Sequence, residues 1–401
     1  MILVINPENL GCCVNYLDTQ ISNKLRRFSM KVDWLIVGAG FTGSVLAERI
    51  ASQLGQKVLI VEQRDHIGGN AYDYHDEHGI LVHKYGPHIF HTSIQKVWNY
   101  LSQFTEWHSY YHHVLAIVNG KPVPVPFNLN SLYALFPPPN ADKLAQQLIA
   151  QYGFNVKIPI LKIRASAKSS DLKFLADYIY ENVFHNYTRK QWDLNLDELA
   201  PSVGARVPIY ISRDDRYFQD TYQGLPKRGY TALFQRMLRH PNIKVLLNTS
   251  YQEINGEIQY KRMFFTGMID DFFAYAHGEL PYRSLFFKSM YTEQEQFQAV
   301  GTINYPNEYQ YTRITEYKHF TGQRTFGSSY VEEYPQSYKR GSNIPYYPIP
   351  KDEYKAIYKQ YKAEIATVND QILFGGRLAD YQYYNMDQAV ERALNLFASL
   401  A

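Results

Sequence analysis

The sequence predicts an α/β protein, in which a Rossmann-like dinucleotide-binding domain is joined to a helical domain and an antiparallel β-sheet domain. Three observations lead to this prediction. A short apolar strand, a glycine-rich turn and a helix follow one another from residue 31. A largely helical stretch runs from about residue 130 to 205, and later segments alternate aromatic and polar residues. A chain of 401 residues is long enough for two or three such domains.

The first element is a β-α-β unit. Trp34 to Val37 form a short apolar strand, the following stretch to about Leu54 has helical spacing of its apolar residues, and Lys57 to Val61 form a β-branched second strand. The turn between the first strand and the helix reads Gly38-Ala39-Gly40-Phe41-Thr42-Gly43. In such a turn the glycines allow a tight bend, a close approach of the backbone to a pyrophosphate and close packing of the helix on the strand.

Two further features indicate which dinucleotide is bound. Glu62 ends the second strand nineteen residues after Gly43, where an acidic side chain can bond ribose hydroxyls. Gly68-Gly69-Asn70 supplies a second flexible turn, which is more typical of two-domain flavoproteins than of nicotinamide dehydrogenases. FAD is therefore favoured over NAD. A late Gly375-Gly376-Arg377 could bring further amides and a cation to the same cofactor.

Apolar spacing and residue type predict the elements of the rest of the chain. Residues 97–101, 141–152 and 171–186 are predicted helices, the last of them burying Phe174, Leu175, Tyr178 and Ile179. Pro122 to Pro126 is predicted to be an extended edge segment, because proline cannot donate to a strand ladder. Residues 309–317 and 323–332 are predicted antiparallel strands. A strand at 371–374 and a helix from Met386 to about Leu400 complete the chain.

Composition excludes several classes of protein. A net charge of +3 is too small for a nucleic-acid footprint unless the charges gather in one cleft. The two cysteines, Cys12 and Cys13, are adjacent, so we expect no disulfide framework and no metal site, which fits a reducing cytoplasm. No apolar run of about 18 residues is present, so we expect no membrane span.

Residues 1–29 are expected to be an appendage outside the fold. Their positive charges follow the short apolar start, the reverse of a secretory signal. Met30 directly precedes the opening strand, so the segment could result from an upstream start.

Eight segments follow, in order, the pattern of one enzyme family. They are Glu62–Asn70, Tyr85–Thr92, Tyr187–Trp192, Gln223–Tyr230, Leu280–Leu285, Thr312–Glu316, Ile344–Pro348 and Gly375–Leu378. Through them, residues 31 to 401 resemble UDP-galactopyranose mutase of the prokaryotic type. The resemblance implies interconversion of UDP-galactopyranose and UDP-galactofuranose for cell-surface glycans, by nucleophilic attack of reduced FAD N5 on the anomeric carbon. It also implies a homodimer.

The resemblance further implies how the domains divide the chain. The FAD-binding domain is expected from residues 31–90, 231–275 and 345–401. The mainly helical substrate domain is expected at 91–205, and the antiparallel sheet domain at 206–230 and 276–344.

The same resemblance implies roles for individual residues. Arg206, on a mobile loop, and Arg313 would bind the diphosphate, and His88 and His91 would lie against the flavin, where histidine can donate to N5 or O4. These four form the expected catalytic set. The expected cofactor-binding set is Gly38, Gly40, Phe41, Thr42, Gly43, Glu62, Gln63, Gly69, Asn70, His88, Arg377, Asn385 and Met386.

The expected substrate site is rich in aromatic residues. Phe184 and Tyr187 would hold the uracil ring and Trp192 would lie beside the sugar. Tyr217, Tyr383 and either Tyr346 or Tyr347 would donate to the phosphates. The full expected substrate-binding set is Phe184, Tyr187, Thr188, Trp192, Arg206, Tyr217, Arg283, Arg313, Tyr346, Tyr347 and Tyr383.

The chain departs from the family pattern at three places. Asn385 stands where many relatives have Asp, and Asn186 and Asp193 stand where glycine is usual. Two other functions stay open. The first is an amine-oxidase-like FAD oxidoreductase, which shares the N-terminal motifs but not the later arginines and aromatics. The second is a non-catalytic flavoprotein that binds nucleotide sugars.

Overall fold

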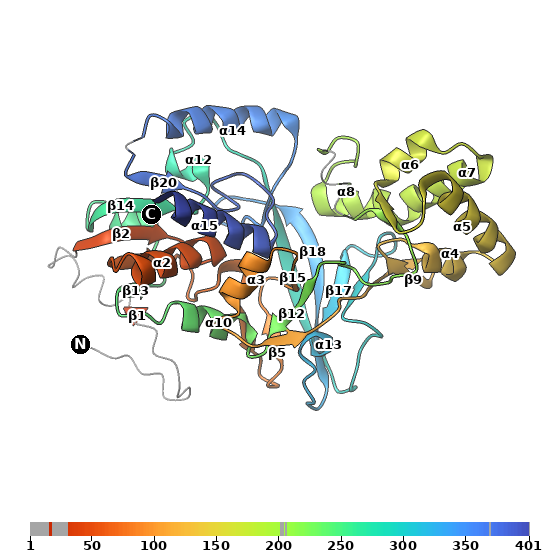
Figure 1. Ribbon diagram of the computed structural model, residues 1–401, viewed down its shortest axis with the longest axis horizontal. Helices are drawn as coiled ribbons and strands as arrows, with labels where there is room; N and C mark the ends of the chain where they lie inside the picture. Colours follow the sequence, from red (N-terminus) through yellow and green to blue (C-terminus); the bar gives the residue numbers. More distant parts are fainter. Residues whose placement is uncertain (1–15, 18–30, 201–203, 205–206, 369, 401) are drawn as a thin grey trace.

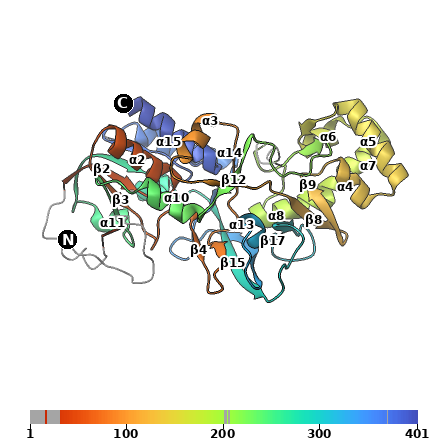
Figure 2. The ribbon, with the colours of Figure 1, turned by 60° about the horizontal axis from the view of Figure 1, so that its bottom comes forward.

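A computed structural model describes residues 16–17, 31–200, 204, 207–368 and 370–400. Its parts lie in a row, with a helix-covered parallel sheet at one end, a mainly antiparallel sheet in the middle and a cluster of helices at the other end (Figure 1). Seen from below, the helical cluster projects away from the two sheets (Figure 2). The predicted α/β fold class, with a Rossmann-like domain, a helical domain and an antiparallel sheet domain, is confirmed.

The parallel sheet has six strands in the order β1–β13–β3–β2–β14–β20, and every pair is parallel. The strands are β1 (Tyr16–Leu17), β2 (Lys31–Val37), β3 (Val58–Val61), β13 (Ile243–Leu246), β14 (Gln259–Phe265) and β20 (Ile372–Phe374). Apart from β1, they come from the three segments expected for the dinucleotide-binding domain.

Both faces of this sheet are covered. Trp34 and Ile36 of β2 pack on one side, while Leu35 between them packs on the other. This alternation follows from the two-residue period of a strand. The first face is covered by α2 (Phe41–Gln53), α10 (Gly229–Met237) and α15 (Met386–Leu400). The second face and the adjoining core involve α11 (Tyr251–Ile254), α12 (Ile269–Phe272) and α14 (Asp352–Ile365).

One part of the N-terminal segment belongs to this sheet. Tyr16 and Leu17 pair in parallel with Val245 and Leu246 at the sheet edge. The expectation that residues 1–29 lie outside the fold is therefore wrong for these two residues. The other residues up to 30 lie outside the described part of the chain.

The middle sheet has seven strands in the order β19–β15–β18–β17–β16–β8–β9, antiparallel except for the β16–β8 pair. They are β8 (Val114–Val118), β9 (Lys121–Val125), β15 (Tyr282–Thr292), β16 (Thr302–Asn304), β17 (Arg313–Glu316), β18 (Ser328–Ser337) and β19 (Tyr347–Pro348). The expected limit of the helical domain at 91 is therefore wrong for β8 and β9, because β8 pairs with β16. The proline-rich β9 is an edge strand, as predicted.

The helical cluster contains α4 (Leu129–Leu135), α5 (Pro138–Tyr152), α6 (Ile160–Ser166), α7 (Ser170–Ile179), the π-helical turn η3 (Tyr180–His185) and α8 (Asn186–Trp192). Leu175 and Ile179 are buried as predicted, but Phe174 is 59% exposed because it lies on the outer face of α7. The strands β10 (Val156–Ile158) and β11 (Ile209–Ile211) pair here. β11 was expected in the sheet domain, and its pairing with β10 corrects that boundary.

Short elements connect the two sheets. β12 (Tyr222–Pro226) lies between β6 (Phe90–Thr92) and β7 (Trp107–Ser109), and β4 (Asp73–His75) pairs with β5 (Leu81–His83). The remaining helices are η2 (Gly69–Ala71), α3 (Gln95–Leu101) and α13 (Lys318–Thr321). Within the described ranges, we find no helix long and apolar enough to cross a membrane.

Candidate functional site

The glycine-rich turn between β2 and α2 is closed too tightly for a side chain at Gly43. The Gly38 amide donates to the Val61 carbonyl at 2.8 Å, and a Cβ on Gly43 would lie 2.1 Å from the Gly38 oxygen. A Cβ on Gly69 would lie 2.9 Å from the Gly40 Cα. Two glycine turns distant in sequence are therefore in contact, and their bare backbone forms a cradle that fits a pyrophosphate.

Glu62 joins this cradle to the next loop. Its carboxylate is buried and accepts the Ala39 amide at 2.9 Å and the Arg64 amide at 3.0 Å. Each oxygen keeps a second lone pair, so the carboxylate is able to accept ribose hydroxyls while it holds the two loops. Asn70 accepts from Arg64 Nη2 at 2.9 Å, and Gln63 is exposed.

The late glycine pair reaches the same turn. A Cβ on Gly376 would lie 3.4 Å from the Thr42 Oγ1, so the segment after β20 closes the cradle from the other side. Arg377 follows, and its Nη2 donates to the Tyr384 carbonyl at 2.7 Å. Asn385 and Met386 come next, at the start of α15. Phe41 serves mainly the core, where its ring contacts Phe234 at 4.7 Å.

His88 lies on a turn that is held from behind by a second histidine. The His88 amide donates to His83 Nδ1 at 3.0 Å, and the Tyr230 hydroxyl donates to the His88 carbonyl at 3.0 Å. Burial lowers the pKa of His83 to about 3 and that of His88 to about 4. Both rings are therefore neutral at pH 7. His88 Nδ1 lies 2.9 Å from the Gly86 carbonyl, an acceptor, so the His88 proton is on Nδ1 and Nε2 is an acceptor.

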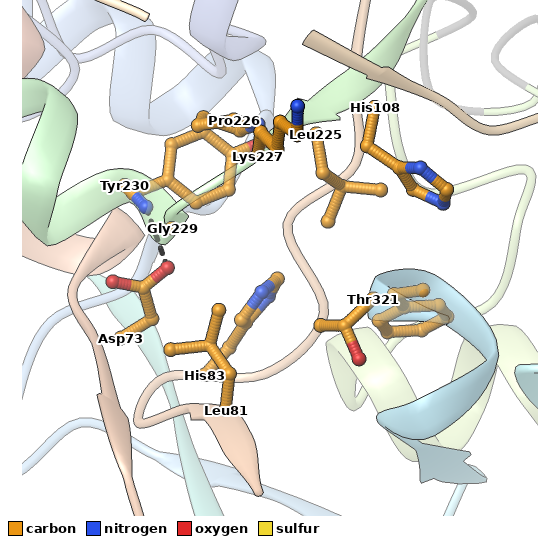
Figure 3. A pocket seen from close by; sticks show the side chains of 11 residues that line it. Asp73, Leu81, His83, His108, Leu225, Pro226, Lys227, Gly229, Tyr230 and Thr321 are labelled. Carbon is orange, nitrogen blue, oxygen red and sulfur yellow. Dashed lines mark hydrogen bonds between the residues drawn. The ribbon is translucent and has the colours of Figure 1, made fainter. Parts of the chain in front are cut away.

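The space behind this turn is small. It is lined by Asp73, His83, Tyr230 and neighbouring side chains, and Asp73 accepts the Tyr230 amide at 2.6 Å (Figure 3). The cavity measures about 20 Å³, which is room for about one water molecule. It is a small gap in the packing behind the His88 turn and is too small for a substrate.

His91 is oriented by a partner that the sequence did not reveal. Its Nδ1 lies 2.9 Å from Asp220 Oδ2, and its ring stacks on Phe218 at 3.6 Å. The hydrogen bond with His91 lowers the pKa of Asp220. The ring of His112, a buried residue, lies 6.1 Å from the ring of Phe218, and the His112 carbonyl accepts the Tyr217 amide at 2.7 Å.

The second half of the site is built around Arg313. Glu333, 1% exposed on the neighbouring strand, accepts from Arg313 Nε at 2.9 Å. Burial raises the pKa of Tyr187, whereas the positive charge of Arg313 lowers it. The Tyr187 hydroxyl therefore lies close enough to Arg313 to feel its charge. Glu333 was missed by sequence reasoning because an acidic residue on a strand is usually solvated, and only the strand register puts it opposite Arg313.

Three aromatic residues lie close to Arg313 and Glu333. Tyr347 stacks on Tyr383 with ring centroids 4.9 Å apart, and Trp192 lies 6.2 Å from each of them. The Arg377 guanidinium lies over the same two tyrosines, at 5.6 and 5.4 Å from their centroids. Arg377 therefore links the dinucleotide cradle to the aromatic cluster.

Two expected substrate residues are used within the protein. Tyr346 is 4% exposed and packs in a separate core cluster with Tyr85 and Leu285. Arg283 is 5% exposed and donates to the carbonyls of Gln191 and Lys190, at 2.9 and 3.2 Å. Beside Arg283 and Trp192 lies a hollow of about 420 Å³.

The remaining expected residues lie in the helical cluster or outside the residues that the structure describes. Thr188 and Phe184 are buried on α8 and η3, and Phe184 belongs to the core of the helical cluster. Arg206 lies outside the described residues. Over the part of the chain that is described, we find no group of three metal-ligating side chains.

Comparison with known proteins identifies the family. Residues 182–383 match the family model for UDP-galactopyranose mutase, and residues 36–104 match that for an NAD(P)-binding Rossmann-like domain. A Klebsiella pneumoniae protein described as "Probable UDP-galactopyranose mutase" is 37% identical, over 90% of this chain and 92% of its own length. A dTDP-fucopyranose mutase of Escherichia coli is 36% identical, over 90% of this chain and 96% of its own length.

A solved structure agrees with these sequences. The crystal structure of a reduced UDP-galactopyranose mutase superposes with a TM-score of 0.73 at 17% identity, covering 92% of this chain and 94% of that one. The later segments that carry Tyr187, Arg313 and Tyr347 fall within the matched range 182–383. The chain belongs to the UDP-galactopyranose mutase family.

Proposed function

We propose that this protein interconverts UDP-galactopyranose and UDP-galactofuranose with the help of reduced FAD. The observation that carries the proposal is the position of Arg313. Its Nε and Nη2 face Glu333, while its Nη1 makes no hydrogen bond to any described residue. A guanidinium held on one edge and open on the other suits a diphosphate.

The cradle fits the cofactor. Contacts of Gly40 with Gly69 and of Gly376 with Thr42 leave bare backbone where a pyrophosphate would lie, and Glu62 stands beside it. Gly38, Gly40, Gly43, Gly69 and Asn70 would hold the dinucleotide, and Arg377 would reach from it toward the substrate. When bound, reduced FAD supplies the nucleophile for the anomeric carbon.

The residues of the chain would stabilise the departing diphosphate. Arg313 would neutralise the charge that develops as the glycosidic bond breaks, and Arg206 is proposed to assist from its own segment. Burial raises the pKa of Tyr347, so its hydroxyl stays protonated and is able to donate to a phosphate oxygen. The stack with Tyr383 fixes the direction of that donor.

His88 would act as an acceptor. Its ring is neutral and its proton lies on Nδ1, so Nε2 offers a lone pair. Such a lone pair suits the N5–H of a reduced flavin better than an oxidised one, which has no proton there. The histidine was expected to donate, and the hydrogen bond to Gly86 favours the opposite role.

The base side of the substrate would lie at Phe184 and Tyr187, and the sugar beside Trp192. Trp192 lies within 6.2 Å of the two stacked tyrosines. Tyr347 is favoured over Tyr346 as the phosphate donor, because the Tyr346 ring is packed with Tyr85 in the core. The homodimer and the cytoplasmic location stay predictions.

The test is a comparison of oxidised and reduced protein. The purified holoprotein is reduced with dithionite, and conversion of UDP-galactofuranose is followed by chromatography. Conversion by the reduced form alone supports the proposal, and its absence rejects it. Turnover by the oxidised form with release of hydrogen peroxide would instead support the amine-oxidase-like alternative, and tight UDP binding without turnover would support the non-catalytic one.

A second substrate is worth testing in parallel. The dTDP-fucopyranose mutase is almost as similar to this chain as the Klebsiella pneumoniae relative, at 36% against 37% identity. The same assay with dTDP-fucofuranose therefore decides between a galactose and a 6-deoxygalactose substrate. We expect the larger kcat/KM for the UDP-linked sugar.

A further inference from the structure

Helix α8 carries Tyr187 and Trp192, yet its hydrogen bonds tie it to the seven-stranded sheet. We propose that the side-chain amide of Asn307 clasps the start of α8 to the segment leading into β17. The clasp fixes the distance between a nucleobase subsite at Tyr187 and a diphosphate subsite at Arg313. This inference rests on the proposed function and adds a positioning residue to the same site.

The Asn307 amide is used at both ends. Its Oδ1 accepts from Asn186 Nδ2 at 3.0 Å, and its Nδ2 donates to the Asn182 carbonyl at 3.0 Å. A flipped amide would place the Asn307 oxygen against the Asn182 carbonyl, so only one orientation satisfies both contacts. Lys190 Nζ adds a third bond, to the Tyr305 carbonyl at 2.8 Å.

These contacts join two segments that carry the proposed subsites. Asn182 and Asn186 flank Phe184, and Asn186 directly precedes Tyr187. On the other side, Asn307 lies six residues before Arg313, at the start of β17. A shift of the 305–312 segment relative to α8 would therefore change the separation of the two subsites.

The π-helical turn η3 lies between α8 and the rest of the helical cluster. α7 packs into that cluster through Leu172, Leu175 and Ile179. An extra residue in a helical turn rotates the following side chains by about 100° around the axis. α8 therefore does not continue the buried face of α7, and its position depends on its contacts with the sheet.

The far end of α8 is held by the same sheet. Arg283 on β15 donates to the carbonyls of Lys190 and Gln191, where a helix leaves carbonyls without partners and a cation is favourable. Arg283 is buried, whereas the Asn186–Asn307 contact is exposed. The Asn307 end can therefore be altered without opening a core.

One side of the clasp is a residue at which this chain departs from the family pattern that it resembles. Asn186 stands at a position where the family pattern has glycine, and glycine has no side chain to donate. Its backbone is helical, with φ −70° and ψ −35°, so the position does not require glycine. The side chain is thus free to serve the contact with Asn307.

The experiment separates the two subsites by ligand size. UDP spans both, uridine occupies the base subsite and inorganic pyrophosphate the other. Dissociation constants of all three are measured by calorimetry for the wild-type holoprotein and for Asn307→Ala, Asn186→Gly and Gln310→Ala. Gln310 is exposed in the same segment and has no hydrogen bond to a described residue, so its variant is the matched control.

We expect UDP binding to weaken about fivefold in Asn307→Ala and about twofold in Asn186→Gly, as for the loss of net hydrogen bonds. Uridine and pyrophosphate should bind all three variants as they bind the wild type. If thermal unfolding shows that Asn307→Ala is misfolded, Asn186→Gly decides alone.

Two results would overturn the clasp. One is unchanged UDP affinity in Asn307→Ala and Asn186→Gly. The other is an equal loss for uridine and UDP, which would show damage to the base subsite instead of altered spacing. In both of these results the wild-type protein still binds UDP, so the proposed function would stand. A wild-type protein that binds no UDP would instead reject the proposed function, and the clasp with it.

Discussion

Glu333 holds Arg313 through a single carboxylate oxygen, which accepts from Nε at 2.9 Å and lies 2.8 Å from Nη2. The pair is fixed by the backbone, because the antiparallel register of β17 and β18 places the two residues opposite each other. The other carboxylate oxygen is buried without a hydrogen-bond partner among the described residues. The carboxylate thus aims the guanidinium and leaves one edge of it for a ligand.

The first prediction concerns this pair. Glu333→Gln keeps the shape but replaces a charge-assisted hydrogen bond with a neutral one, so the guanidinium loses its fixed direction. We expect kcat/KM to fall on the order of tenfold to a hundredfold. Steady-state kinetics of the reduced protein measures this fall in kcat/KM. Glu332→Gln is the control, because Glu332 pairs with the half-exposed Lys288 on the sheet surface. Equal effects of the two variants would contradict the assignment.

The arginines themselves should matter more. Arg313→Ala and Arg206→Ala remove charge that would stabilise the leaving diphosphate, and each should lower kcat by on the order of a hundredfold or more. Single-turnover kinetics with reduced protein checks the chemical step directly. Near-normal rates in both variants would show that the diphosphate lies elsewhere.

The glycine cradle gives a prediction about flavin content. A Cβ at Gly43 would lie 2.1 Å from the Gly38 carbonyl oxygen, so Gly43→Ala must push α2 away from β2. We expect the variant to be purified with little bound flavin, as read from its visible absorbance. Gly79→Ala is the matched control, since a Cβ there meets nothing within 4 Å and costs only about 1–2 kcal/mol of backbone strain.

The neighbouring tyrosines should differ in their effect on activity. Tyr347→Phe removes a hydroxyl from the cluster with Tyr383 and Arg377, and should lower kcat/KM about tenfold. Tyr346→Phe changes a ring packed in the core with Tyr85 and should leave kcat/KM within about twofold. The reverse order of effects would mean that Tyr346 contacts the substrate.

The buried histidines predict how stability depends on pH. Burial lowers the pKa of His83 and of His112 to about 3, against about 6.5 in an unfolded chain. Between those values the unfolded chain binds more protons than the folded one, so the free energy of unfolding falls as the pH is lowered from about 6.5 toward 3. Urea unfolding of the holoprotein at several pH values measures the slope.

Replacing single histidines tests which residue causes this dependence of the unfolding free energy on pH. His83→Gln keeps an acceptor for the His88 amide but cannot be protonated, so its slope should be shallower than that of the wild type. His75→Gln, at an exposed position, should leave the slope unchanged. Parallel slopes for wild type and His83→Gln would contradict the prediction.

The sequence by itself determined the dinucleotide half of the protein. The strand, the glycine turn from Gly38 to Gly43 and the helix to Gln53 are adjacent in the chain, so local spacing predicts them. The edge strand at Lys121–Val125 and the last helix from Met386 were also predicted correctly. Prolines in a strand and the spacing of apolar residues in a helix are local signals, which need no knowledge of distant contacts.

Tertiary structure alone decided the rest. That Glu333 lies opposite Arg313, that Asp220 orients His91 and that Asn307 reaches Asn186 depends on strand register and on contacts between residues up to 129 positions apart. The same holds for the split between Tyr346 and Tyr347, since neighbouring residues with equal chemistry differ only in which side of the chain is buried. Residue types can be predicted from a pattern, but partners are fixed only when distant segments pack.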